Sequence, residues 1–121
     1  MNKESALYAF WNTFSIPAYE ENTVPDDAEL PYITYQVITD GRFGQAQMAV
    51  NLYYRSNSWV DINAKAVAIS EEIQGGVRLD TDDGWIWIKK GTPFAQNMSD
   101  GSDDTIRRKY LNIVAEYCTT K

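Results

Sequence analysis

The side chains that perform most acid–base and metal chemistry are scarce in this sequence. It contains no histidine, which removes the commonest general base and the commonest metal ligand. Its single cysteine, Cys118, has no histidine to activate it and no second cysteine for a disulfide or a cysteine-based zinc site. A glycine-rich phosphate loop and a nucleophile-elbow motif are also missing. We therefore expect a protein that is not an enzyme and that uses no metal and no cofactor.

Two acidic segments have the composition of cation-binding loops. They are residues 80–84, Asp-Thr-Asp-Asp-Gly, and residues 100–104, Asp-Gly-Ser-Asp-Asp. A helical calcium loop, however, needs twelve residues and a distal bidentate glutamate, and neither segment matches that pattern. We interpret the first as a hairpin turn and the second as a solvated loop. Glu116 alternates with Asn112 in a predicted strand, so we expect it to face solvent rather than a pocket that would raise its pKa.

The charge balance argues against nucleic acid as the main ligand. The chain has 17 acidic and 11 basic residues, for a formal net charge of −6, and its basic runs are short, at residues 89–90 and 107–109. Sequence-independent binding to a phosphate backbone needs clustered Lys and Arg. No apolar stretch approaches the roughly 18 residues of a membrane span, and the N-terminus lacks the plan of a signal peptide. These features predict a protein made in the cytoplasm with no membrane partner.

The length of 121 residues and the 44% hydrophobic content predict a single domain, residues 1–121. Its most informative stretch is residues 45–55, where Ala46, Met48, Val50, Leu52 and Tyr54 alternate with mostly polar residues. This period of two predicts a strand about 36 Å long, at roughly 3.3 Å per residue, with one apolar face. A strand of that length suggests a protein that contacts neighbours.

Two amphipathic helices are predicted. Residues 3–14 have a cap at Asn2, a stop at Pro17 and one apolar stripe, formed by Leu7, Phe10, Trp11 and Phe14. Residues 59–74 have a capping box of Ser58 with Asp61 and an Asp61–Lys65 pair on the outer side. The apolar stripe of this second helix is Trp59, Ile62, Ala66, Ile69 and Ile73, which we expect to pack on Met48, Val50 and Leu52.

The remaining alternating runs predict strands. Residues 32–39 should pair with the long strand through a turn at 40–44, and residues 77–79 should pair with 85–88 through Asp83-Gly84. Trp85 and Trp87 share one face, which we expect to pack beneath a helix. A break at 91–93 and a polar loop at 95–105 follow. Residues 108–118 fit both periods, but their Tyr and Ile content favours a strand. The predicted fold is α+β, a mainly antiparallel sheet with two helices packed on one face.

The order of these elements resembles a known family. The features that carry the resemblance are an N-terminal helix, Ile-Pro-Ala-Tyr at 16–19, Leu-Pro-Tyr-Ile-Thr-Tyr at 30–35, a long-stranded hairpin, a helix begun by Ser58-Trp59, Gly-Thr-Pro-Phe-Ala-Gln at 91–96 and a final Arg-rich strand. Together they resemble the tail terminator (tail completion) proteins of bacteriophages with long, non-contractile tails, sometimes described as minor capsid proteins. The resemblance covers nearly the whole chain.

The resemblance implies a virion protein of the tail or neck without catalytic residues. In that family, six copies close into a ring that caps the head-proximal end of the tail tube, stops polymerisation of the tube protein and joins the head connector. The expected partners are therefore further copies of the chain, the tail-tube protein and a neck protein, with DNA passing through without specific binding. Another neck component (a head–tail adaptor or stopper), the tube subunit, and a small-molecule-binding module that uses exposed aromatics remain as alternatives.

Assembly of that kind would need contact surfaces and a channel. We predict that Arg42 and Phe43, at the tip of the first hairpin, touch a neighbouring subunit or the tube. Arg107, Arg108 and Lys109 should also make protein contacts rather than DNA contacts. A lumen lined by carboxylates would let DNA slide without sticking, and the candidates for it are Asp26, Asp27, Asp100, Asp103 and Asp104.

Overall fold

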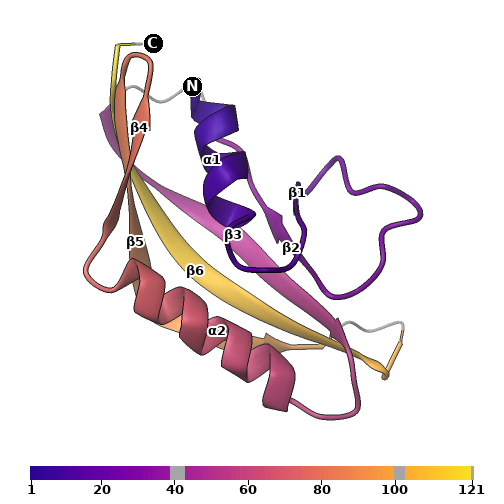
Figure 1. Ribbon diagram of the computed structural model, residues 1–121. Coiled ribbons are helices and arrows are strands. Elements are labelled where there is room, and N and C mark those ends of the chain that lie inside the picture. The colour runs from indigo at the N-terminus through magenta and orange to yellow at the C-terminus, as the bar shows by residue number, and fades with distance from the viewer. Residues whose placement is uncertain (39–42, 100–102, 121) are drawn as a thin grey trace.

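The computed structural model describes residues 1–38, 43–99 and 103–120, and the described chain forms one six-stranded sheet with two helices on one face (Figure 1). The predicted α+β fold is therefore confirmed. The elements in chain order are α1 (Lys3–Trp11), β1 (Ala18–Glu20), β2 (Tyr32–Tyr35), β3 (Phe43–Arg55), α2 (Val60–Ile73), β4 (Val77–Thr81), β5 (Gly84–Met98) and β6 (Ile106–Thr119).

The sheet is built around its last strand. The strand order is β1-β2-β3-β6-β5-β4, and all neighbours are antiparallel except β1 and β2, which are parallel. β6 pairs with the whole of β3, from Phe43 opposite Cys118 to Arg55 opposite Ile106. The long strand predicted at 45–55 is thus confirmed, and residues 108–118 belong to a strand rather than to a helix.

The first helix ends earlier than its apolar stripe suggested. Asn2 caps it as predicted, since its Oδ1 accepts from the Ser5 N–H at 2.8 Å. The helix stops at Trp11 because Asn12 turns its side chain back onto the backbone: Nδ2 donates to the Tyr8 carbonyl at 2.8 Å and Oδ1 accepts from the Ala18 N–H at 3.0 Å. Phe14 lies outside the helix but remains buried in the core.

The second helix packs as predicted, although its start differs. Ile62, Ala66, Ile69 and Ile73 are buried in one cluster with Met48, Val50 and Leu52. The predicted capping box does not form, because Trp59 is the N-cap and the Ser58 hydroxyl instead accepts from the Val60 N–H at 3.1 Å. Lys65 does not pair with Asp61 either. Its ammonium donates to the Phe14 carbonyl at 2.6 Å, a backbone group left without a helical partner beyond the end of α1.

The predicted break at 91–93 does not end the strand, and the predicted loop at 95–105 begins too early. β5 continues to Met98, and the irregular residues are absorbed in a shift of register between Lys90 and Ala95. A bulge tolerates the proline there because the residue needs no ladder hydrogen bond. Gly91 suits the same place, since a Cβ atom on it would lie 2.5 Å from the Asn112 side chain.

The two predicted hairpins form with small changes. β2 ends at Tyr35, where Gln36 uses its side-chain Oε1 to accept from the Ala49 N–H at 2.8 Å; residue 39 lies outside the described residues. In the second hairpin the two-residue loop is Asp82-Asp83, so Gly84 is already the first residue of β5.

Ile69→Asp should unfold a large part of this core. Ile69 is fully buried beneath α2, and an unpaired carboxylate there should cost several kcal/mol. Val67→Asp is the matched control, because Val67 lies in the same helix but is 55% exposed. Chemical denaturation of both variants measures the difference. Equal midpoints would contradict the assignment of the buried face.

Gly84→Ala should destabilise the pairing of β5 with β6. Gly84 has a φ of +152°, and a Cβ atom on it would lie 1.9 Å from the Cys118 carbonyl oxygen. The backbone strain alone should cost roughly 1–3 kcal/mol, before β6 shifts to relieve the clash. Gly75→Ala is the control, because nothing lies within 4 Å of the added atom. A melting temperature unchanged in Gly84→Ala would show that the two strands do not approach this closely.

Candidate interaction surface

The acidic segments do not form a metal centre within the described part of the chain. Among the described residues, no group of three or more His, Cys, Asp or Glu side chains is placed to hold a metal ion. Residues 80–84 form the tight hairpin that the sequence predicted, in which Asp80 accepts from Arg78 Nε at 2.8 Å and the Asp83 carboxylate accepts from the Thr81 hydroxyl at 3.0 Å. Asp100 lies outside the described residues.

The sheet has one face without a helix, which we call the helix-free face. Because side chains alternate along a strand, the buried residues of β6, such as Leu111, Ile113 and Ala115, point toward the helices, and the residues between them point the other way. The cross-strand register then assigns the facing residues of the neighbouring strands. The aromatic side chains that this assignment places on the helix-free face are Tyr19, Tyr32, Tyr53, Trp85, Trp87 and Tyr110.

Three of these tyrosines form a ladder across neighbouring strands. The ring centroids of Tyr19 and Tyr32 are 5.7 Å apart, and those of Tyr32 and Tyr53 are 5.3 Å apart. All three side chains are only partly buried. A partly exposed row of tyrosines beside polar groups has the composition of a protein interface.

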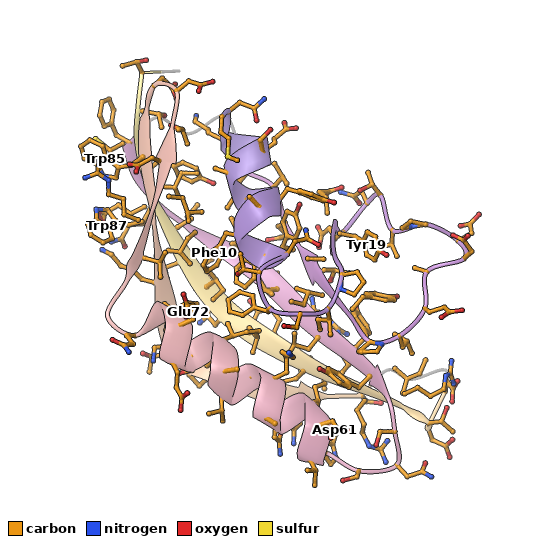
Figure 2. The ribbon with its side chains drawn as sticks, viewed as in Figure 1. Phe10, Tyr19, Asp61, Glu72, Trp85 and Trp87 are labelled. Carbon is orange, nitrogen blue, oxygen red and sulfur yellow. The ribbon has the colours of Figure 1, made fainter. Side chains whose placement is uncertain are left out.

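The prediction that Trp85 and Trp87 pack beneath a helix is wrong. Ile86 and Ile88 take the core positions of β5, so strand alternation turns the two tryptophans away from the helices. Figure 2 shows both side chains on the side of the hairpin away from α1. The Arg78 guanidinium lies over the Trp85 ring, 4.8 Å from its centroid. Both rings therefore add aromatic surface to the helix-free face.

The basic run at 107–109 is divided between the two faces of the sheet. Arg107 lies on the helix side, where it donates to the Asn57 carbonyl at 3.0 Å and sits 5.5 Å from the centre of the Trp59 ring. Lys109 is buried on the same side and donates to Asn97 Oδ1 at 2.5 Å, and burial lowers the pKa of its ammonium. Arg108 alone of the three lies on the helix-free face.

Arg108 opens onto a small polar pocket. Its Nε donates to Asn51 Oδ1 at 2.9 Å, and no hydrogen bond of its two terminal nitrogens is found within the described chain. The pocket has a volume of about 350 Å³ and is also lined by Tyr32, Tyr53 and Glu21. A guanidinium that is held in place through Nε and has unused N–H donors can bind a carboxylate of another molecule. Within the run 107–109, Arg108 is thus the side chain that the fold leaves available for contacts.

The predicted acidic residues lie in two connections. Asp26 and Asp27 are exposed in the segment between β1 and β2. Asp103 precedes β6, where its carboxylate accepts from the Thr105 hydroxyl at 2.6 Å and lies 3.3 Å from Arg55 Nη1. Hydrogen bonds from Thr105, and then Arg55, lower the pKa of Asp103. Asp104 is exposed. Whether any of them faces a channel stays a prediction.

The predicted hairpin tip is described only in part. Phe43 begins β3 and is 75% exposed, whereas Arg42 lies outside the described residues. An exposed phenylalanine at the end of a long strand is compatible with a contact to another chain. The interface role of this tip stays a prediction.

Sequence reasoning missed the division of the basic run and the full extent of the helix-free face. Strand alternation, extended from residues 111–117 back to residue 107, is the signal that separates Arg108 from its two basic neighbours.

No helix in the described part of the chain is both long and apolar enough to cross a membrane. No protein-family model matches this chain, and no curated protein matches it.

Glu116 should make stability depend on pH. Its carboxylate accepts from Gln45 Nε2 at 2.9 Å and from Lys89 Nζ at 3.1 Å, and these two groups, in that order, lower its pKa. A lowered pKa means that the stabilisation is present above the ordinary glutamate range and is lost as pH falls through the lowered value. Glu116→Gln should therefore unfold at lower urea than the wild type at about pH 7, with a smaller difference at about pH 3.

Glu72→Gln provides the matched control, because Glu72 is an exposed glutamate of α2 (Figure 2). It should leave the urea midpoint nearly unchanged at both pH values. A difference between Glu116→Gln and wild type that stays constant with pH would contradict the assigned hydrogen bonds.

Proposed function

We propose that this protein is a structural component of a virion that assembles into a ring and acts as a tail terminator. In this role the ring caps the head-proximal end of the tail tube, stops its polymerisation and joins the neck. The observation that carries the proposal is the helix-free face, a sheet surface with six aromatic side chains and an anchored arginine that neither helix covers. The sequence resemblance supports the same role.

The composition of the helix-free face favours a protein partner. Tyr, Trp and Arg are the residues that most often anchor interfaces, and here they sit on rigid strands rather than on loops. Their polar ends keep such a surface soluble before assembly. A small ligand would instead need an enclosed pocket with converging polar groups, and the tryptophans of β5 stand on an open sheet surface (Figure 2).

A closed ring needs two different surfaces on each copy. Heterologous contacts join one patch to another and close when the rotation between copies divides a full turn. The helix-free face offers Trp85 and Trp87 of β5 near one end of the strand order, beside Arg78 of β4. Tyr19 of β1 and Tyr32 of β2 lie at the other end, and Arg108 lies between the two groups on β6. We propose that these two ends supply contacts to neighbouring copies, together with Phe43.

The proposed partners are further copies of the chain, the tail-tube protein and a head-connector protein. DNA would pass through the ring without specific binding, past acidic segments that include Asp26 and Asp27. A head–tail adaptor, a stopper or a tube subunit would share the ring and differ in the partner. A small-molecule-binding module would instead use the exposed aromatics in a single copy.

Trp85→Ser should weaken assembly without unfolding the chain, because the side chain is partly exposed and lies outside the core. Native mass spectrometry, with and without tail tubes of the partner protein, measures the number of copies. Val60→Ser is the control, since Val60 is a 71% exposed apolar residue on α2. We expect assembly to be lost in the first variant and kept in the second.

The double variant Arg42→Ser with Phe43→Ser tests the hairpin tip in the same assay, and we expect it to impair assembly while the monomer stays folded. Normal assembly by this variant would remove the tip from the interface. A wild-type chain that stays monomeric with and without tube ends would overturn the proposed function, and binding of a small ligand by that monomer would favour the module.

A further inference from the structure

A groove separates α1 from the edge of the sheet formed by β1 and β2. Its volume is about 630 Å³, which is within the range of ligand-binding sites. Figure 1 shows α1 running beside these two strands. The groove lies on the helix side of the sheet, apart from the helix-free face. The lining residues that matter here come from α1, from the ends of β1 and β2 and from the segments that follow these strands: Glu4, Tyr8, Glu20, Thr23, Tyr35 and Val37.

Tyr35 forms part of the floor of this groove. Its side chain is 2% exposed, and its ring stacks on Trp11 with the centroids 6.5 Å apart. Its hydroxyl makes no hydrogen bond within the described chain, and it is not among the fully buried polar atoms that lack a partner, so this oxygen keeps access to solvent. Burial raises the pKa of Tyr35, and the charges of Tyr8, Glu20 and Glu4 raise it further. Tyr35 lines the groove together with these three residues, so the small accessible part of its side chain opens into the groove.

The two glutamates place negative charge on the walls of the groove. Glu20 is held in position because its carboxylate accepts from the Asn22 N–H at 3.0 Å and from Asn22 Nδ2 at 2.9 Å. Glu4 makes no ion pair within the described residues. The walls therefore hold one fixed carboxylate and one that is free to turn toward a ligand.

The neighbouring cations are engaged elsewhere. Met1 lines the groove, but its terminal ammonium pairs with the Asp82 carboxylate at the tip of the second hairpin. Lys3 is the adjacent cation in sequence, but it is buried and its ammonium lies over the Tyr117 ring. No lysine or arginine is among the described residues that line the groove. Among the described residues, the two carboxylates thus have no cationic side chain as a partner.

We propose that this groove binds an arginine or lysine side chain presented by a protein partner. Carboxylates bind guanidinium and ammonium groups through charge-assisted hydrogen bonds, and the Tyr35 hydroxyl offers one more acceptor. The Tyr8 ring, 56% exposed, offers a face for a cation–π contact. The apolar walls at Ala9 and Val37 suit the residues that flank the basic side chain. Binding of such a side chain does not require a ring of copies.

A pair of matched peptides tests the proposal. The probe is the acetylated and amidated peptide Ala-Ala-Arg-Ala-Ala, and its control carries citrulline, a neutral isostere, in place of arginine. Binding to the full chain is followed by amide NMR shifts at residues 4–9, 20–23 and 35–37. We expect the arginine peptide to shift these residues, the citrulline peptide to bind at least about tenfold more weakly, and added salt to weaken the arginine complex.

Protein variants separate this site from general attraction to an acidic chain. Glu4→Gln and Tyr35→Phe should each weaken the arginine peptide, by about fivefold or more for Glu4→Gln. Glu72→Gln removes the same charge from α2 and should leave binding unchanged. The proposal is overturned if both peptides bind equally, if neither binds at millimolar concentration, or if Glu72→Gln weakens binding as much as Glu4→Gln. Equal binding of free arginine amide would overturn the protein partner in favour of a small amine.

Discussion

The pairing of β6 with β3 on one side and β5 on the other is the interaction on which the rest of the fold depends. β6 joins two long strands by antiparallel ladders, and its side chains alternate between buried and partly exposed along most of its length. A shift of one residue would exchange the two faces and expose Leu111, Ile113 and Ala115. The positions of both helices, and of the residues on the helix-free face, follow from this single register.

Most of the fold could be predicted from periodicity, and the errors have local physical causes. Alternation identified the long strand and the final strand, and the helical stripe identified the core face of α2. The early end of α1 and the start of α2 depend on side-chain hydrogen bonds of Asn12 and Ser58, which compete with the helix and leave no trace in periodicity. The bulge in β5 depends on how β6 accommodates residues 91–94, which is a tertiary effect.

The candidate surface was harder to predict because it depends on which side of a strand each residue occupies. Arg107, Arg108 and Lys109 look like one basic patch in the sequence, yet the strand separates Arg108 from the other two. Burial of Lys109 has a cost, since a buried ammonium loses its hydration and its described hydrogen-bond partner is the neutral amide of Asn97. A patch of charge read from sequence therefore needs the strand register before it can be assigned to a surface.

The described charges are distributed so that unlike surfaces lie on opposite sides of the same sheet edge. On the helix side of β1 and β2, Glu4 and Glu20 face a groove without a lysine or arginine among its described lining residues; on the other side, Arg108 faces a pocket with free donors. Glu21 also lines this pocket, so the pocket offers an acidic partner the donors of Arg108 rather than a net positive charge. Two copies of the acidic groove would repel each other, which disfavours a symmetric dimer through that groove. Contact between the groove of one copy and the Arg108 pocket of another would avoid that repulsion, and it is a head-to-tail contact of the kind that a ring would use.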